Sequence, residues 1–190
     1  MFKIFWFDVE TTGLNPEKNA ILQLAYQVTI NEEVKETGEF RMQPFPGDQI
    51  DTQALEINKI TMDQLKGFDN PQKVFHDIQN VLLRYVDKYN KDDKFILAGY
   101  NVGFDVGFLK AFWKKNQDKY FGSFFTYKPL DVYALVLAYC YFRKLTLPNH
   151  KLETMANFFN IPIEAHDARS DIEATRKIFY KIGEQLCPQS

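Results

Sequence analysis

Residues 2–13 read FKIFWFDVETTG and decide the fold, because an apolar run, which predicts a buried strand, ends directly in two acidic residues. Side chains alternate between the two faces of a strand, so Asp8 and Glu10 point the same way. Like charges held side by side are unfavourable unless a cation lies between them, and hard oxygen ligands suit magnesium or manganese. A strand that ends in a polar, helix-capping turn would look the same, so the rest of the chain must decide.

The bulk composition predicts a single domain over residues 1–190 that resides in the cytoplasm. Hydrophobic residues make up 45% of the chain and charged residues 25%, while 18 Phe and 10 Tyr indicate a core or groove rich in rings. We find no signal peptide, no apolar run of membrane-spanning length and no zinc-type spacing of Cys140 and Cys187. The net charge of −2 does not by itself indicate nucleic-acid binding.

Hydrophobic periodicity predicts an α/β fold with a central mixed sheet. Alternating residues over 20–30 and 34–43 extend the first strand into a three-stranded meander, and 95–100 reads as a buried strand. Two short helical turns are expected within 52–66. Longer helices are expected at 71–89, ended by residues 91–94, and then at 103–115, 132–142, 152–159 and 167–186.

Two further acidic elements stand where predicted helices begin. Asp105 closes the stretch Asn101-Val102-Gly103-Phe104-Asp105, in which a strand gives way to a helix. In open α/β sheets this end of the strands is where ligands commonly bind, although a first-turn acid favoured by the helix dipole has the same pattern. His166 and Asp171 stand at the entry to the last helix, where both can face one cavity. His76 and His150 lack acidic company and are assigned no role.

The three elements together resemble the motifs of the DEDDh exonucleases, the DnaQ-like family of polymerase proofreading subunits, RNase T, oligoribonuclease and the TREX enzymes. Asp8 to Gly13 is similar to Asp-x-Glu-Thr-x-Gly, Asn101 to Asp105 to Asn-x-x-Phe-Asp, and His166 to Asp171 to His-x-Ala-x-x-Asp. Any one match would be weak, but three in the right order make a strong signal. The resemblance implies an RNase H-like fold, with a five-stranded mixed sheet flanked by helices.

Phosphodiester hydrolysis explains why such residues belong together. Two divalent ions, Mg²⁺ or Mn²⁺, clamp the attacking and leaving oxygens, and their four positive charges match four carboxylates. We therefore predict Asp8, Glu10, Asp105 and Asp171 as metal ligands. The resemblance implies that Asp8 bridges the ions, that Glu10 and Asp171 share the ion on the nucleophile side, and that Asp105 acts largely through water. His166 is predicted as the general base, because neutral imidazole can accept a proton near neutral pH, and the resemblance implies the same role.

Substrate contacts are predicted mainly from the resemblance, which implies that the turn Thr11-Thr12-Gly13-Leu14 cradles the 3′-terminal nucleotide. Leu14 stacks on a base or else belongs to the core. Ile57, Asn58 and Ile60 are similar to the segment that packs on the terminal base, and Asn101 holds a phosphate or caps a turn. Asp131 is expected to cap a helix. Arg169 meets a phosphate or forms a salt bridge.

The expected function is a metal-dependent 3′–5′ exonuclease that releases nucleoside 5′-monophosphates, with single-stranded DNA favoured as its substrate. A 3′–5′ exoribonuclease and a small-oligonucleotide hydrolase are the alternatives, since the mechanism does not distinguish the two sugars. A non-catalytic nucleic-acid or polymerase-binding module is least expected, because it has no need of four acids and a histidine. The expected partner is a nucleic acid with a free 3′ end. Monomer and homodimer both stay open, as does a polymerase partner, although the sequence does not indicate one.

Overall fold

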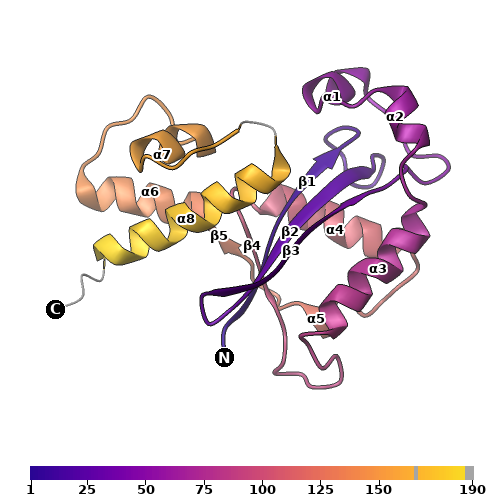
Figure 1. Ribbon diagram of the computed structural model, residues 1–190, viewed down its shortest axis with the longest axis horizontal. Helices are drawn as coiled ribbons and strands as arrows, with labels where there is room; N and C mark the ends of the chain where they lie inside the picture. The colour runs from indigo at the N-terminus through magenta and orange to yellow at the C-terminus, as the bar shows by residue number, and fades with distance from the viewer. Residues whose placement is uncertain (165–166, 187–190) are drawn as a thin grey trace.

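A computed structural model describes residues 1–164 and 167–186 and contains a five-stranded mixed sheet in the order β3-β2-β1-β4-β5 (Figure 1). The strands are β1 (Lys3–Thr11), β2 (Ile21–Ile30), β3 (Glu33–Arg41), β4 (Ile96–Gly99) and β5 (Leu130–Asp131). β1, β2 and β3 form an antiparallel meander, whereas β4 pairs in parallel with β1 and β5 in parallel with β4. The predicted α/β, RNase H-like architecture is confirmed.

Helices cover both faces of this sheet (Figure 1). They are α1 (Thr52–Ile57), α2 (Met62–Lys66), α3 (Pro71–Leu83), α4 (Gly103–Lys115), α5 (Phe121–Phe124), α6 (Val132–Arg143), α7 (Leu152–Phe158) and α8 (Ala168–Leu186). Side chains of α3 and α4 pack on one face of the sheet, and those of α6, α7 and α8 pack on the other. None of the helices in the described ranges combines the length and the apolar character that a membrane span requires.

The residues of β1 alternate between these two layers as the sequence predicts. Phe5, Phe7 and Val9 belong to the ring-rich core beneath α3 and α4, where Phe5 stacks on Tyr26 with ring centroids 5.4 Å apart. Ile4 and Trp6 belong to the core beneath α6 and α8. Because Asp8 and Glu10 continue the series of Ile4 and Trp6, their side chains lie on the α8 face of the sheet.

Three details of the secondary structure differ from the prediction. Helix α3 ends at Leu83, six residues early, where the backbone N–H groups of Arg84 and Tyr85 donate to the carbonyls three residues back, those of Val81 and Leu82. The Tyr85 hydroxyl then donates to Glu36 on β3 (2.9 Å), a contact outside the helix that periodicity cannot reveal. The short α5 and the two-residue β5 have no periodic signal at all.

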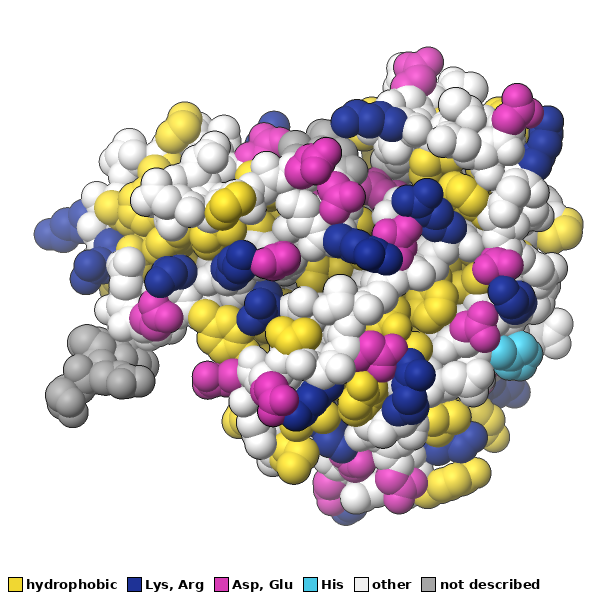
Figure 2. All heavy atoms as spheres, in the orientation of Figure 1, with side chains coloured by type: hydrophobic (Ala, Val, Ile, Leu, Met, Phe, Trp, Pro, Cys, Tyr) yellow, Lys and Arg dark blue, Asp and Glu magenta, His cyan; other side chains and the backbone are white. Residues whose placement is uncertain are grey.

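Charged side chains are dispersed over the surface. Lys and Arg side chains alternate with Asp and Glu on the face shown in Figure 2, in keeping with the small net charge of the chain. Exposed large apolar residues occur on α1, α2 and α6. Nucleic-acid binding therefore has to be judged from the local site and not from a continuous basic surface.

Candidate active site

Asp8 and Glu10 lie in the last part of β1, beyond the residues that pair with β4. That pairing joins Ile4 to Ile96 and Trp6 to Ala98, and β4 ends at Gly99. The carboxylates therefore stand at the carboxyl end of the parallel strands, the edge of an α/β sheet at which ligands bind. Both are partly buried, whereas the intervening Val9 is buried in the opposite core.

Asp105 reaches the same edge from the first turn of α4. Its side chain is only 5% exposed, and its Oδ1 accepts a hydrogen bond from the backbone N–H of Val9 at 3.1 Å. The Val9 N–H lies beyond the end of the β4 ladder, so the carboxylate replaces a strand partner. This contact fixes Asp105 beside β1, between the positions of the two strand acids.

Asp171 approaches from the first turn of α8. The backbone N–H of Asp171 donates to the carbonyl of Asp167 (2.9 Å), and the carboxylate of Asp167 accepts from the N–H of Ser170 (2.8 Å), so Asp167 caps the helix. Oδ1 of Asp171 is buried and has no hydrogen-bond partner among the described residues. A buried anionic oxygen without a partner is costly, and a cation would relieve that cost.

The four carboxylates perturb one another. Burial, together with the charges of Asp105, Glu10 and Asp171, raises the pKa of Asp8 well above its ordinary value. Burial and the charge of Asp171 raise the pKa of Glu10 to about 7. Burial raises the pKa of Asp105 to about 7 against the opposing hydrogen bond from Val9.

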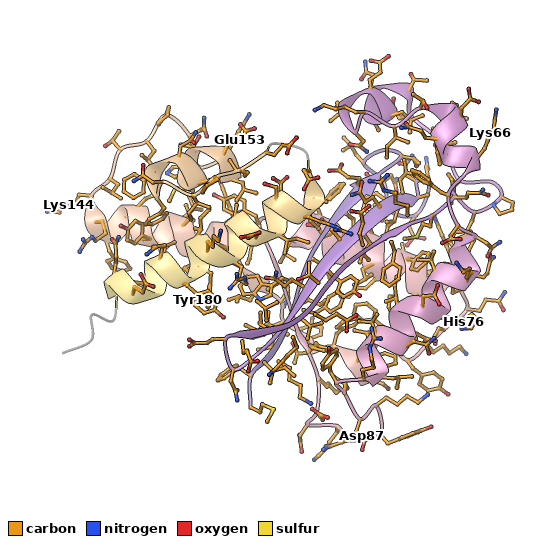
Figure 3. All side chains as sticks on the ribbon, viewed as in Figure 1. Lys66, His76, Asp87, Lys144, Glu153 and Tyr180 are labelled. Atoms are coloured by element: carbon orange, nitrogen blue, oxygen red, sulfur yellow. The ribbon has the colours of Figure 1, made fainter. Side chains whose placement is uncertain are left out.

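The pKa of Asp171 is also raised, but by other neighbours. Burial raises its pKa to about 7, with additional contributions from the charges of Asp167 and Glu153. Glu153 lies on α7, next to the beginning of α8 (Figure 3). The charges of Asp105 and Asp171, from α4 and α8, thus act on the acids of β1. Titration shifts of this size are typical of functional sites.

This donor set fits divalent metal ions. Hard carboxylate oxygens are the ligands that Mg²⁺ and Mn²⁺ prefer, and the unpartnered Asp171 oxygen has a vacant acceptor position. Within residues 1–164 and 167–186, however, no three acidic, histidine or cysteine side chains converge tightly enough to form a ready-made metal centre. Mutual repulsion between like charges favours such a spread arrangement when no cation lies between them. His166, the predicted base, lies outside the described residues.

The predicted nucleotide cradle begins as a tightly bonded turn after β1. The Thr11 hydroxyl donates to the Gly13 carbonyl (2.7 Å), and the fully buried Thr12 hydroxyl donates to the Gln49 carbonyl (2.7 Å) and accepts from the Ala20 N–H. A Cβ on Gly13 would stand 2.6 Å from the Asn19 amide. Thr12 and Gly13 thus shape the turn from inside and leave no side-chain surface for a substrate.

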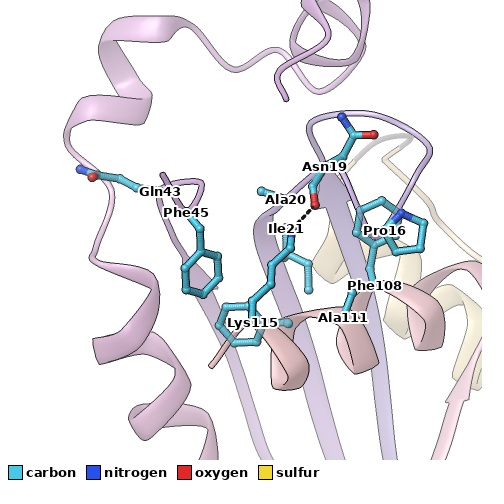
Figure 4. A pocket seen from close by; sticks show the side chains of 10 residues that line it. Pro16, Asn19, Ala20, Ile21, Gln43, Phe45, Phe108, Ala111 and Lys115 are labelled. Atoms are coloured by element: carbon cyan, nitrogen blue, oxygen red, sulfur yellow. Dashed lines mark hydrogen bonds between the residues drawn. The ribbon is translucent and has the colours of Figure 1, made fainter. Parts of the chain in front are cut away.

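Lys115, the last residue of α4, holds this turn in place. The ammonium of Lys115 donates to the Asn19 carbonyl (2.7 Å) and to the Asp48 carboxylate (2.6 Å), and Figure 4 shows the first of these bonds beside Pro16, Phe45 and Phe108. The Asn19 amide in turn donates to the Gln49 carbonyl at 2.9 Å. The cavity among these side chains measures only about 10 Å³, so it serves packing and holds no ligand. No residue pattern predicts this role of Lys115.

Two of the other predicted substrate contacts are exposed. Leu14 is 84% exposed, which excludes the core position left open for it, and Ile57 is 57% exposed at the end of α1. Ile60 is instead partly buried against Leu22, Leu55 and Leu65. The Asn58 amide donates to the Thr11 carbonyl at 2.9 Å and so attaches α1 to the end of β1.

Asn101, Asp131 and Arg169 have structural partners. Asp131 caps α6 as predicted, accepting from the N–H of Tyr133 (3.0 Å), and it also accepts from the N–H of Asn101 (3.0 Å). Asn101 itself adopts a left-handed conformation with an exposed side chain, which stays available to a ligand. Arg169 forms the salt bridge that was one of its two alternatives, with its Nε 3.0 Å from Glu39 on β3.

Comparison with known proteins agrees with the fold and the motifs. The model of the RNase T family, described as Exonuclease, matches residues 5–179. Ribonuclease T of Buchnera aphidicola subsp. Baizongia pistaciae is 31% identical, over 95% of this chain and 85% of its own. DNA polymerase III PolC-type of Listeria innocua is 32% identical over 93% of this chain but only 11% of its own, so the chain spans about a tenth of that relative.

Solved structures show the same fold. The zinc-bound form of the Escherichia coli ExoI–ssDNA complex superposes with a TM-score of 0.81 at 22% identity, over all of this chain and 42% of the other. E. coli Exonuclease I in complex with a dT13 oligonucleotide gives a TM-score of 0.80 at 21% identity, covering 99% of this chain and 42% of the other. With the family model matched over most of its length, the chain belongs to the exonuclease family represented by RNase T.

Proposed function

We propose that the protein is a metal-dependent 3′–5′ exonuclease that hydrolyses the terminal phosphodiester bond of single-stranded DNA and releases nucleoside 5′-monophosphates. The observation that carries this proposal is the placement of Asp8, Glu10, Asp105 and Asp171 at one sheet edge, with raised pKa values and an Asp171 oxygen that has no hydrogen-bond partner among the described residues. Family membership supports hydrolysis of nucleic acid. The PolC-type relatives and the fold neighbours crystallised with DNA oligonucleotides support the choice of DNA.

Each residue has a distinct task in this proposal. Asp8, Glu10, Asp105 and Asp171 would hold two divalent ions, Mg²⁺ or Mn²⁺. When bound, such ions neutralise charge on the phosphate and support both the attacking and the leaving oxygen. Asp105 is positioned by the Val9 N–H, and Asp171 by the cap at Asp167. His166 would accept the proton of the attacking water, a role assigned from its place in the sequence motif.

The exposed side chains after β1 are suited to the terminal nucleotide. Leu14, in the turn after β1, and Ile57, at the end of α1, offer apolar surface without being needed for the core. A base can stack on such surface whatever its identity, which agrees with a nuclease that removes any nucleotide. The Thr11–Leu14 turn is rigid, because Thr12 and Asn19 are both bonded to the Gln49 carbonyl. In this proposal it supplies a fixed floor for the 3′ end.

A second candidate substrate is RNA. Ribonuclease T of Buchnera is a relative that this chain matches over most of both lengths, and the proposed chemistry does not itself distinguish ribose from deoxyribose. The two substrates are separated by competition between DNA and RNA oligonucleotides of the same sequence. A preference of tenfold or more for either sugar assigns the substrate class.

The decisive experiment measures degradation of single- and double-stranded oligonucleotides labelled at the 5′ or the 3′ end, with Mg²⁺, Mn²⁺ or EDTA. The expected result is stepwise shortening of the 5′-labelled single strand, release of labelled mononucleotide from the 3′ end, and no reaction in EDTA. Asp8→Asn should abolish activity, whereas the matched control Asp92→Asn, in the loop before β4, should not. Activity in EDTA or in Asp8→Asn would contradict the proposal.

The proposed base is tested separately. His166→Ala should lower kcat by two or more orders of magnitude while leaving metal affinity nearly unchanged, because the imidazole acts on the water and not as a ligand. Metal affinity is read from the thermal shift on addition of Mn²⁺. His76→Ala, on α3, serves as the histidine control for non-specific effects. Near-normal turnover of His166→Ala would exclude the general-base role.

A further inference from the structure

A groove with a volume of about 620 Å³ opens at the carboxyl ends of β4 and β5. Tyr100 and Asn101, directly after β4, line it on one side, and Tyr133 lines it from the first turn of α6. His150 and Lys151, at the entry to α7, complete it. Four of these five residues have no part in the site described above. The groove is wide enough for a nucleotide and offers both ring surfaces and a cationic side chain.

The groove lies beside the acidic cluster. Continuing the parallel register in which Trp6 pairs with Ala98 places Tyr100 level with Asp8. Tyr100 and Asp8 also line one narrow pocket together with Thr175 of α8. A molecule in the groove is therefore adjacent to a phosphate at the acids, with Tyr100 between them.

The exposed residues assigned to the terminal nucleotide lie toward the other side of β1. Asn58 bonds α1 to Thr11, and the Leu14 turn leads into β2. The groove instead lies over β4 and β5, which are on the opposite side of β1 from β2 in the sheet. A strand whose 3′-terminal nucleotide rests beside Leu14 and Ile57, and whose scissile phosphate meets the acids, thus continues toward the groove.

We propose that this groove binds the nucleotide on the 5′ side of the scissile phosphate, with its base against Tyr133 and its own phosphate beside Lys151. The inference rests on the proposed exonuclease function and adds the position of the penultimate nucleotide. It assigns a substrate-binding role to a loop in which the sequence indicated none. Asn101, one of the predicted substrate contacts, has an exposed side chain and lines the same groove.

The ring surface in the groove is held in place before any substrate binds. Tyr133 packs edge-on against Tyr100, with ring centroids 5.7 Å apart and an interplanar angle of 72°. The Tyr100 hydroxyl donates a hydrogen bond to the carbonyl of His150. One tyrosine therefore supports both the stacking ring and the loop, and a preorganised aromatic surface binds any base without sequence preference.

Lys151 is the cationic group at the rim of the groove. Its backbone N–H donates to the Asn149 side chain (3.0 Å), which also accepts from the hydroxyl of Thr154 (2.6 Å), so the loop backbone is fixed. The Lys151 side chain is exposed, and no ion pair found among residues 1–164 and 167–186 includes it. Its charge is thus available to a phosphate.

The test compares two substrates that differ only on the 5′ side of the scissile bond. The p-nitrophenyl ester of thymidine 5′-monophosphate carries the terminal nucleotide but no penultimate one, whereas oligothymidylates of three to eight nucleotides carry both. Tyr133→Ala and Lys151→Ala should raise KM for the oligonucleotides by about fivefold or more and leave kcat and KM for the ester within about twofold. Tyr133→Phe should retain oligonucleotide binding.

Salt dependence adds an independent readout. Lys151→Ala removes one phosphate contact and should therefore reduce the slope of log affinity against log salt concentration by about 0.7. The affinity is measured by fluorescence anisotropy with 5′-fluorescein oligothymidylate in Ca²⁺. Lys91→Ala is the matched control, because this exposed lysine precedes β4 and so lies near its opposite end. It should change neither KM nor the slope.

The outcomes separate the two proposals. Equal losses on the ester and the oligonucleotides, or unchanged oligonucleotide KM and salt slope in both variants, would overturn the groove assignment while leaving the exonuclease proposal intact. Absence of hydrolysis of either substrate by the wild-type protein with metal would overturn the exonuclease proposal instead. The anisotropy measurement would then still decide whether the groove binds a strand, since it needs no turnover.

Discussion

Asp105 accepts a hydrogen bond from the backbone N–H of Val9, although the two residues are 96 positions apart in the sequence. Through this contact the first turn of α4 is joined to β1 between its two acidic residues. The acid is therefore part of the strand-edge structure as well as of the proposed metal site. Charge and hydrogen bonding at this position have opposite effects on stability, and substitutions can separate them.

Asp105→Asn keeps an acceptor oxygen for Val9 but removes a negative charge from the cluster. In EDTA at pH 8 we expect this variant to be as stable as the wild type or more stable. Asp105→Ala leaves the Val9 N–H buried without a partner, which costs about 1–3 kcal/mol relative to Asp105→Asn. Urea unfolding followed by circular dichroism measures the difference. Equal stability of the two variants would show that the hydrogen bond contributes nothing.

Stability without metal should fall as the pH rises. Glu10, Asp105 and Asp171 have pKa values of about 7 in the folded protein, while unfolded carboxyl groups titrate near 4. Between these values the folded state binds more protons, so the stability contributed by the neutral acids is present below pH 4 and lost through pH 7. We expect the free energy of unfolding in EDTA to drop by roughly 3 kcal/mol or more between pH 5 and 8.

Metal ions and charge removal should both reverse this trend. Millimolar Mn²⁺ should restore stability at pH 8, because the ion binds the folded, ionised cluster. Asp8→Asn should flatten the pH dependence in EDTA, and Asp92→Asn should leave it unchanged. Thermal denaturation scans at each pH provide the measurement. A pH-independent stability of the metal-free wild type would exclude repulsion within the cluster.

The bridge between Arg169 and Glu39 should position Asp171. Glu39 binds Arg169 with one oxygen and Arg41 (Nε at 2.6 Å) with the other, and so connects the start of α8 to the edge strand β3. Glu39→Gln should cost less than about 1 kcal/mol, because both arginines are largely exposed. It should nevertheless raise the Mg²⁺ concentration for half-maximal activity several-fold. Glu33→Gln, which breaks only a pair within β3, is the control and should change neither quantity.

Leu14 should affect substrate binding and not folding. Since its side chain is 84% exposed, Leu14→Ala should alter stability by no more than about 0.5 kcal/mol. Loss of the apolar contact should raise KM for both the nitrophenyl ester and the oligonucleotides, and Leu14→Met should retain most of the affinity. Leu83→Ala, an exposed leucine at the end of α3, is the control. Unchanged KM in Leu14→Ala would remove Leu14 from the nucleotide site.

The fold could be predicted because β1 and the long helices carry strong periodic patterns. The alternation of Phe5, Trp6 and Phe7 between two cores follows directly from strand geometry. The two residues of β5 could not be recognised in this way, since their pairing depends on β4, which lies 31 residues earlier. The end of α3 was mispredicted for a similar reason, because Tyr85 is drawn out of the helix by Glu36.

The acidic residues of the site could be predicted more completely from the sequence than the residues that surround the proposed substrate. Its four carboxylates can be recognised by residue type and motif, and the structure places them at one edge of the sheet; they are Asp8, Glu10, Asp105 and Asp171. The structural roles of Thr12, Asn58 and Lys115 rest on single backbone carbonyl partners, which no residue pattern encodes. The groove beside Tyr133 depends on a loop brought in from 50 residues beyond Tyr100 and was likewise invisible to periodicity.

The alternation along β1 also constrains how this gene can change. A substitution at a ring position of the strand alters one layer, whereas inserting or deleting a single codon before Asp8 would shift every following side chain to the other face. Val9 would then occupy the acidic edge, and the two carboxylates would enter the Phe-rich core. The number of residues between the start of β1 and Asp8 is thus inherited as a fixed spacing, even where their identities are free to vary.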